Sequence, residues 1–257
     1  MAADARHPYL DWPGPIAFAH RGGASEAPEN TMPAFERAVS LGYTYLETDA
    51  HVTTDGVVVA FHDDDLSRTC GRPGRISELP WAEVSTARVD GVEPIPTLHD
   101  VFDAFPTARL NVDCKSDEAV GPLGDVLAAE PGRLARTCIG SFDSRRLRRL
   151  RRRFGARVCT SFGTAEIALL RLGSLAVRGP LAVQVPVRSY GLPLVTASFV
   201  RRCHRRGLAV HVWTIDDAAE MHRLLDLGVG GIMTDRPEIL REVLVDRAGW
   251  VPNDRVG

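Results

Sequence analysis

Four short runs between residues 16 and 63 decide the fold: IAFAHRG at 16–22, PENT at 28–31, YLETDA at 45–50 and VVVAFHD at 57–63. Three of these runs contain apolar residues with β-branched or aromatic side chains, a composition typical of buried strands. Each of the three carries histidine or carboxylate residues at or near its end. The pattern therefore predicts strands whose ends bring charged and titratable side chains together.

Strand candidates alternate with helix candidates along most of the chain. The expected strands are 16–20, 44–50, 57–61, 109–114, 138–141, 158–161, 181–185, 208–213 and 231–234. The expected helices are 32–41, 98–105, 118–129, 144–154, 165–172, 196–206 and 217–227. Thr31 is expected to cap the first helix, with Pro33 in its opening turn and Gly42 after its end.

The second and third strands have no helix between them. Their connection contains Asp55-Gly56, a dipeptide that favours hairpin turns, so the third strand should return antiparallel to the second. This return would bring His62 to the same mouth as His20. Without the returning strand, eight parallel strands remain, the number found in a (β/α)8 TIM barrel. A doubly wound α/β sheet is the alternative, because alternating strands and helices do not distinguish the two folds.

Residues 63–96 fit none of the barrel elements. This segment is rich in glycine and proline, and it is too long for an ordinary connection. We expect it to form a small inserted subdomain over the barrel mouth, within a single domain that covers residues 1–257.

The composition excludes several classes of protein. With 31 basic and 33 acidic residues the net charge is −2, which gives no argument for binding to nucleic acid or to a membrane surface. The sequence shows neither a signal-peptide pattern nor a run of about 18 apolar residues that could span a membrane. The five cysteines are widely spaced without a CxxC pair, which argues against a disulfide framework or a zinc site. These features predict a cytoplasmic protein.

Three carboxylates are candidates for a metal site. Glu47 and Asp49 alternate on one expected strand, so their side chains share a face, and Asp113 lies similarly on a later strand. Two carboxylates about 4 Å apart repel by roughly 4 kcal/mol at an effective dielectric constant near 20. One divalent cation would remove this cost, and oxygen ligands favour Mg²⁺ or Ca²⁺. The alternative is that the acids pair with Arg21 or Lys115 and bind no metal.

Other residues at the strand ends suit chemistry on a phosphate. His20 and His62 each end a strand, and imidazole titrates near neutrality, as acid–base catalysis requires. Arg21 offers a bidentate contact to phosphate oxygens, and Lys115, the one lysine among 31 basic residues, can add a point charge. Trp213 either forms an apolar wall for an alcohol group or caps the barrel core.

Three further features are weaker candidates. His51 either lies behind the carboxylates or packs within the hairpin, and Gln184 could be a polar group at the rim. The run Arg145–Arg153 contains seven arginines. It could attract anionic lipid, but a solvated helix face is the favoured interpretation in a chain so rich in arginine.

Taken together, the motifs resemble the glycerophosphodiester phosphodiesterase family. They keep the family's order from residue 16 to residue 237: HRG at 20–22, PENT at 28–31, ExD at 47–49, TDG at 54–56, HD at 62–63, RT at 68–69, IPTL at 95–98, DxK at 113–115, VWT at 212–214 and GIMTDRP at 231–237. The resemblance implies a barrel with a small insertion after its second strand. It also implies hydrolysis of glycerophosphodiesters to glycerol 3-phosphate and an alcohol.

The resemblance also implies a role for each site residue. The metal ligands would be Glu47, Asp49 and Asp113, the acid–base pair His20 and His62, and the phosphate contacts Arg21 and Lys115. Glu29 and Asn30 belong to the family's site region without a defined role. The family usually has Glu in place of Asp113, and often Asn at Asp216 and Asp at Gly230. We expect the last two changes, near the rim, to affect substrate preference more than chemistry.

Two other functions remain open from the sequence. One is lysophospholipase D activity on lysophospholipids, which needs an apolar slot beside the same site. The other is a barrel that binds phosphodiesters without cleaving them. The head group, the physiological cation, the nucleophile and the oligomeric state are not determined by the sequence.

Overall fold

The barrel strands follow one another around a nearly closed ring in the order β8-β7-β6-β2-β1-β13-β12-β9. The computed structural model describes residues 7–172, 179–189 and 191–253, so the ends of the expected domain, 1–6 and 254–257, lie outside it. The parallel strands are β1 (Ile16–Ala19), β2 (Tyr45–Val52), β6 (Arg109–Cys114), β7 (Thr137–Gly140), β8 (Cys159–Thr160), β9 (Ala182–Pro186), β12 (Ala209–Trp213) and β13 (Gly231–Thr234). A parallel bridge between Ser161 and Ala182 joins the two ends of this order. The expected TIM barrel is confirmed, and the doubly wound sheet, which has two open edges, is wrong.

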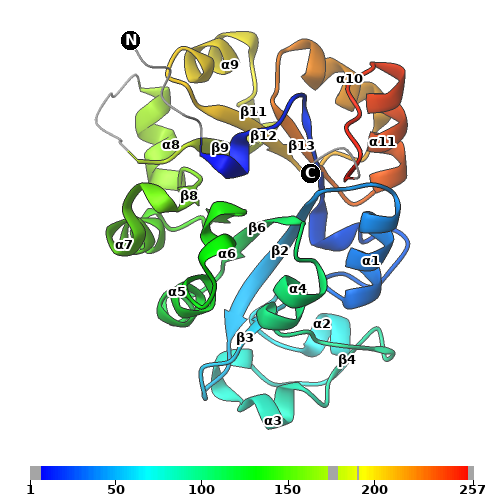
Figure 1. The fold of residues 1–257 in the computed structure, drawn as a ribbon, viewed down its shortest axis with the longest axis vertical. Helices are drawn as coiled ribbons and strands as arrows, with labels where there is room; N and C mark the ends of the chain where they lie inside the picture. Colours follow the sequence, from blue (N-terminus) through cyan, green and yellow to red (C-terminus); the bar gives the residue numbers. More distant parts are fainter. Residues whose placement is uncertain (1–6, 173–178, 190, 254–257) are drawn as a thin grey trace.

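Helices surround the strands (Figure 1). They are α1 (Met32–Ser40), α4 (Leu98–Ala104), α5 (Val120–Ala128), α6 (Pro131–Ala135), α7 (Ser144–Phe154), α8 (Thr164–Arg171), α9 (Ala197–His204), α10 (Ala218–Asp226) and α11 (Pro237–Asp246). Shorter elements are η1 (Pro8–Leu10), η2 (His20–Gly22), η4 (Gly155–Arg157) and the hairpin of β10 (Arg188–Ser189) with β11 (Leu192–Pro193). The sequence patterns miss α6 and α11, although Pro237 in the first turn of α11 is a helix-start signal. No helix in the described part of the chain combines the length and hydrophobicity needed to cross a bilayer.

Thr31 does not cap α1 in the expected way. It occupies the N-cap position, but its side chain makes no capping hydrogen bond to the helix. Its hydroxyl instead donates to the carbonyl of Pro28 at 2.7 Å. The PENT run therefore folds back on itself ahead of α1.

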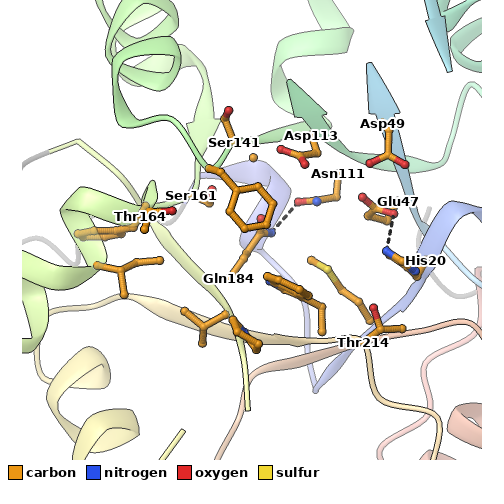
Figure 2. A pocket seen from close by; sticks show the side chains of 18 of the residues that line it. His20, Glu47, Asp49, Asn111, Asp113, Ser141, Ser161, Thr164, Gln184 and Thr214 are labelled. Carbon is orange, nitrogen blue, oxygen red and sulfur yellow. Dashed lines mark hydrogen bonds and ion pairs between the residues drawn. The ribbon is translucent and has the colours of Figure 1, made fainter. Parts of the chain in front are cut away.

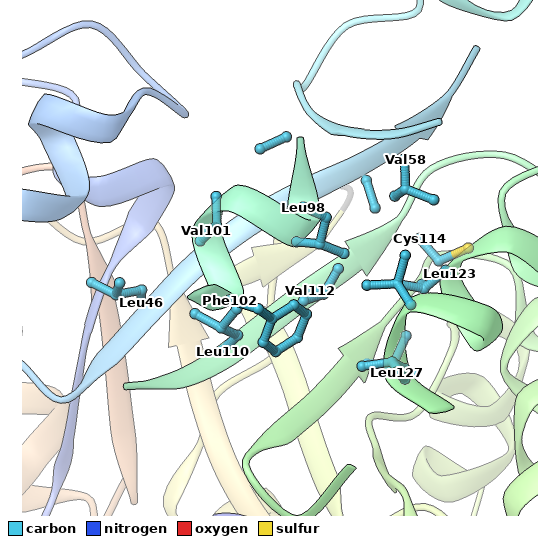
Figure 3. Close-up of a cluster of buried hydrophobic side chains, with 14 of the residues drawn as sticks. Leu46, Val58, Leu98, Val101, Phe102, Leu110, Val112, Cys114, Leu123 and Leu127 are labelled. Carbon is cyan, nitrogen blue, oxygen red and sulfur yellow. The ribbon is translucent and has the colours of Figure 1, made fainter. Parts of the chain in front are cut away.

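Alternation along β2 and β6 decides which side chains enter the barrel. Leu46 of β2 and Leu110 and Val112 of β6 point outward, where they pack with Phe102 of α4 and Leu123 of α5 (Figure 3). Burial of each such side chain contributes roughly 1.5–3 kcal/mol, so a one-residue slip of either strand would be strongly unfavourable. Because successive side chains point to opposite faces, this outward set places the intervening polar residues inside the barrel.

The inserted segment follows an extension of β2 beyond the barrel. β3 (Val58–Ala60) pairs antiparallel with this extension, as the Asp55-Gly56 turn predicts. The segment continues through α2 (Ser67–Cys70), η3 (Ile76–Glu78), α3 (Trp81–Val84), β4 (Arg88–Val89) and β5 (Glu93–Pro94). It has its own apolar cluster, which includes Phe61, Leu66 and Ile76. Figure 1 shows it beside the end of β2 and β3, and a covering role over the mouth stays a prediction.

Candidate active site

A cavity of about 630 Å³ opens at the carboxyl ends of the barrel strands. Eight of the ten side chains predicted for the site line it: His20, Arg21, Glu47, Asp49, His62, Asp113, Lys115 and Trp213. Figure 2 shows Glu47, Asp49 and Asp113 side by side on β2 and β6, with His20 facing Glu47. The other two predicted residues, Glu29 and Asn30, do not line the cavity but contact side chains that line it.

His20 is held in a tight turn directly after β1. Its Nδ1 atom lies 2.7 Å from Oδ1 of Asp235, and its Nε2 atom lies 3.8 Å from Oε2 of Glu47. Burial lowers the pKa of His20, but the carboxylates of Glu47 and Asp235 outweigh burial and hold it above its ordinary value. The neighbouring Arg21 has a left-handed backbone with φ of 51°, an unfavourable conformation that lets adjacent side chains both reach the cavity.

Arg21 is fixed by three carboxylates. Its backbone N–H donates to Oε2 of Glu47 at 3.0 Å, and its Nη1 donates to Oε1 of Glu29 at 3.0 Å. Its Nε lies 3.4 Å from Oδ2 of Asp49. The guanidinium predicted to bind phosphate is thus oriented by the acids around it.

Lys115 lies between two of the carboxylates. Its Nζ atom is 2.8 Å from Oδ1 of Asp49 and 2.7 Å from Oδ2 of Asp113. Burial lowers the pKa of Lys115, but these two acids outweigh burial and hold it above its ordinary value. At Asp49 burial favours the neutral acid, yet Lys115 and Arg21 outweigh burial and lower the pKa. In this structure Lys115 therefore neutralises two of the three predicted metal ligands.

Of the three carboxylates, Glu47 has the least positive charge nearby to offset the loss of hydration on burial. It is only 4% exposed, and burial together with the charge of Asp49 raises its pKa to about 7. A cation beside Glu47 would stabilise its ionised form, because an opposite charge offsets the loss of hydration.

The carboxylates fit a hard cation by donor chemistry, but they are not arranged around one. Within residues 7–172, 179–189 and 191–253, no three histidine, cysteine or acidic side chains form a group that could hold a metal ion. The ammonium of Lys115 bridges Asp49 and Asp113, so a cation bound by all three acids would compete with Lys115.

Asn30 and Glu29 have separate structural roles. Asn30 is buried, its Nδ2 donates to Oδ2 of Asp49 at 2.9 Å, and its Oδ1 accepts from the hydroxyl of Thr48 at 2.7 Å. Its backbone is left-handed with φ of 57°, which asparagine tolerates better than most residues. Glu29 accepts hydrogen bonds from both Arg21 and Arg68.

His62 is anchored at the end of β3 by several groups. Its Nδ1 lies 2.6 Å from Oδ1 of Asp63, and its carbonyl lies 3.1 Å from Nε2 of His51. The hydrogen bond from Arg68 lowers the pKa of Asp63 to about 2. Arg68 of the inserted segment thereby links Asp63, the partner of His62, to Glu29, the partner of Arg21. His51 contacts the backbone of His62, so a position behind the site fits His51 better than simple packing within the hairpin.

The side of the cavity away from the carboxylates is apolar. Its lining includes Phe142, Phe162, Ile167, Leu194 and Trp213. The rings of Phe142 and Trp213 meet edge to face with centroids 5.8 Å apart. This contact supports the apolar wall, and Trp213 also packs against the apolar cluster that includes Phe18 and Met233, so both interpretations of Trp213 hold.

Comparison with known proteins agrees with this geometry. A sequence profile described as the glycerophosphoryl diester phosphodiesterase family matches residues 20–239. The chain belongs to this family. A Mycobacterium tuberculosis protein named "Probable glycerophosphodiester phosphodiesterase 2" is 41% identical, with 94% of this chain and 95% of that protein covered. A lysophospholipase D of Homo sapiens is 30% identical, with coverage of 88% and 85%.

A solved structure supports the fold. An Oleispira antarctica phosphodiesterase in complex with the product sn-glycerol-3-phosphate has a TM-score of 0.75 and 22% identity, with 90% of this chain and 97% of that chain covered. The predicted family resemblance is therefore confirmed, and the chain is a phosphodiesterase of the glycerophosphoryl diester family.

Two of the positions that differ from the family pattern, Asp216 and Gly230, lie at opposite ends of the barrel. Asp216 accepts hydrogen bonds at 2.8 Å from both the hydroxyl of Thr234 and the N–H of Asp235, so it supports the partner of His20. Gly230 directly precedes β13 and bonds Val210 and Ile16 at the amino ends of the strands. The expectation that Gly230 lies near the rim is wrong, since the mouth is at the opposite end.

Sequence reasoning about the family site missed the role of one residue and the contacts within a second group. Asp235 received no role, although it follows β13, the neighbour of β1, and should therefore lie beside His20. The second group crosses the barrel interior. Nε2 of Gln184 donates to Oδ1 of Asn111 at 2.6 Å and lies 3.3 Å from Nδ1 of His211. Alternation with Asp113 predicts Asn111 on the inward face, and Gln184 is a predicted polar candidate at the rim, but their contact with each other and with His211 was not predicted.

Proposed function

We propose that this phosphodiesterase hydrolyses glycerophosphodiesters to glycerol 3-phosphate and an alcohol at the mouth of the barrel. The observation that carries the proposal is one cavity lined by two histidines, Arg21, Lys115 and three carboxylates. Membership of the glycerophosphoryl diester phosphodiesterase family supports the same reaction. The name of the Mycobacterium tuberculosis relative agrees with it.

The two histidines would transfer the protons. A carboxylate lies against Nδ1 of each ring, Asp235 at His20 and Asp63 at His62, which leaves Nε2 as the exchanging nitrogen. One imidazole takes the proton of the nucleophile, and the other protonates the leaving alkoxide. The nucleophile is water or the neighbouring glycerol hydroxyl of the substrate. Arg21 and Lys115 neutralise the charge on the phosphoryl oxygens.

Glu47, Asp49 and Asp113 are the residues that would hold one Mg²⁺ or Ca²⁺. When bound, such an ion polarises a phosphoryl oxygen as a Lewis acid. Burial and the charge of Asp49 raise the pKa of Glu47, and a bound cation would oppose that rise by stabilising the carboxylate.

A release assay for glycerol 3-phosphate tests this proposal. Glycerophosphodiesters with several head groups are incubated with the protein, first with a chelator and then with each cation added back. Release that stops with the chelator and returns with Mg²⁺ or Ca²⁺ supports the reaction and its cation. Binding of the diesters without any release would instead support the non-catalytic barrel.

A second candidate substrate is a lysophospholipid. The apolar wall that includes Phe142, Phe162 and Trp213 provides a surface for an acyl chain beside the polar half of the cavity. The human relative at 30% identity is named a lysophospholipase D. Turnover of lysophosphatidylcholine against glycerophosphocholine distinguishes the two substrates. A cytoplasmic location is part of the same proposal, supported by five free thiols.

A further inference from the structure

Basic residues are concentrated in one part of this nearly neutral chain. Residues 133–206 contain 17 arginines and two acidic residues, Asp143 and Glu166, whereas the remaining residues contain 14 basic and 31 acidic ones. This segment runs from α6 to α9, and Figure 1 shows α7, α8 and α9 next to one another around one side of the barrel. Positive charge is therefore in excess over this part of the barrel's outer layer.

Much of this positive charge is exposed. Ten arginines of the segment are exposed in the described structure: Arg145, Arg148, Arg149, Arg152, Arg153, Arg157, Arg171, Arg188, Arg201 and Arg205. On α7, Arg148, Arg149 and Arg152 form no ion pair with any carboxylate that the structure describes, whereas Arg145 and Arg153 pair with Asp143 and Asp125. The half-buried Arg151 is different, since it is bound to Glu166.

Apolar side chains project at the mouth on the same side. Phe142, which precedes the N-cap residue of α7, is 62% exposed, and Leu192 of the β10–β11 hairpin is 64% exposed. Arg188 of the same hairpin lines the cavity. Because each barrel helix begins at the carboxyl end of a strand, the first turn of α7 lies at the mouth, and Arg148 and Arg149 lie within roughly one Debye length of it.

We propose that the flank formed by α7, the β10–β11 hairpin and α9 docks on an anionic lipid surface. The arginines attract and orient the molecule, and Phe142 and Leu192 enter the interfacial region so that the cavity opens toward the bilayer. Each arginine near an anionic membrane strengthens binding by roughly fivefold. Exposed apolar residues beside the cavity favour a lipid surface as the partner, because a bilayer has an apolar layer beneath its charged head groups. The charged phosphate backbone of a nucleic acid offers no such layer.

Sedimentation with vesicles tests the proposal. Wild-type protein is expected to bind vesicles of phosphatidylglycerol mixed with phosphatidylcholine, and not vesicles of phosphatidylcholine alone, at about 0.1 M salt. A triple variant with reversed charges on α7, namely Arg148→Glu, Arg149→Glu and Arg152→Glu, should bind the anionic vesicles about 100-fold more weakly or worse. A control triple variant carries the same charge reversal at three exposed arginines outside the segment, Arg75, Arg88 and Arg241. Its net charge changes equally, but its affinity for the vesicles should fall by less than about tenfold.

Leu192→Ser separates a lipid surface from a general polyanion site. It should weaken vesicle binding by about tenfold while leaving binding to duplex DNA unchanged. Absence of binding to the anionic vesicles, equal losses in the two triple variants, or no effect of Leu192→Ser on vesicle binding would each overturn the proposal. Thermal unfolding, rather than turnover, checks the fold of every variant, so the result is independent of the proposed reaction.

Discussion

Nδ1 of His20 lies 2.7 Å from Oδ1 of Asp235, although 215 positions separate the two residues in the chain. They meet because β1 and β13 are neighbours, with Ala19 paired to Thr234 immediately before them. The contact directs Nε2 of His20 toward Glu47. Closure of the barrel, rather than local sequence, therefore orients this imidazole.

Asp235→Asn removes the charge of this partner and keeps its shape. We expect turnover to fall by about 10–100-fold, less than the roughly 10²–10⁴-fold loss expected for His20→Ala. Because Asp235 helps to raise the pKa of His20, the limb of the pH–rate profile that reports His20 should move to lower pH. Steady-state kinetics across neutral pH measure both effects, with Asp217→Asn at the N-cap of α10 as the control. An unchanged profile would remove Asp235 from this role.

Lys115→Met leaves Asp49 and Asp113 without their shared cation. We expect the free energy of unfolding in chelator to fall by roughly 3–5 kcal/mol, as when one partner of a buried ion pair is removed. Added Mg²⁺ or Ca²⁺ should recover more stability in the variant than in the wild type, since the ion no longer competes with the ammonium. Urea unfolding with and without each cation measures this difference. Equal responses of the two proteins would argue against a cation held by these acids.

Arg68→Ala tests whether the inserted segment supports the site. Arg68 joins Glu29 and Asp63, which in turn hold Arg21 and His62. We expect turnover to fall by about tenfold, because the second contact of each acid remains. Arg72→Ala is the matched control, since Arg72 bonds only Thr86 and the carbonyl of Glu83 among the described residues. Equal activity of both variants would show that the insertion acts independently of the site.

Strand alternation explains how much of the site was predictable. Leu46 and Leu110 must face the helices, so Glu47, Asp49 and Asp113 must face the interior, and the sequence pattern states this directly. The order of apolar runs and helices predicts eight parallel strands, but closure into a barrel rather than a doubly wound sheet is a property of the whole strand order, seen only in the structure. Local patterns of this kind depend only on neighbours in the chain.

The contacts between distant residues were not predictable in the same way. Whether Lys115 binds a phosphate or bridges Asp49 and Asp113 depends on distances set by the pairing of β2 with β6. Gly230 lies at the end of the barrel opposite the mouth because it precedes β13, whose carboxyl end forms part of the mouth. A motif match does not take the direction of a strand into account. Such errors arise where a residue was assigned by family position rather than by strand direction.

Phe142→Ser tests the apolar wall of the cavity. We expect kcat/KM for lysophosphatidylcholine to fall by about 10-fold, because an exposed aromatic surface for the acyl chain is lost. The value for glycerophosphocholine, which lacks that chain, should change much less. Kinetics with both substrates check the prediction, and Leu172→Ser, an exposed residue at the end of α8, serves as the control. Parallel losses on both substrates would assign Phe142 to the reaction itself rather than to chain binding.

His211 should make the stability of the protein depend on pH. It is fully buried in β12, its Nε2 has no hydrogen-bond partner among the described residues, and burial lowers its pKa from 6.5 to about 3. Below about pH 6.5 the unfolded chain takes up a proton at this position and the folded chain does not, so stability is lost progressively as the pH falls toward 3. The loss attributable to His211 is about 2 kcal/mol at pH 5.

Urea unfolding between neutral pH and pH 5 measures this loss. His211→Gln should reduce the slope of stability against pH, whatever its effect on stability at neutral pH, because glutamine does not titrate. His204→Gln, at an exposed position on α9, should leave the slope unchanged. If His211→Gln and the wild type have the same slope, His211 takes up a proton in the folded barrel as readily as in the unfolded chain, and burial does not lower its pKa as stated.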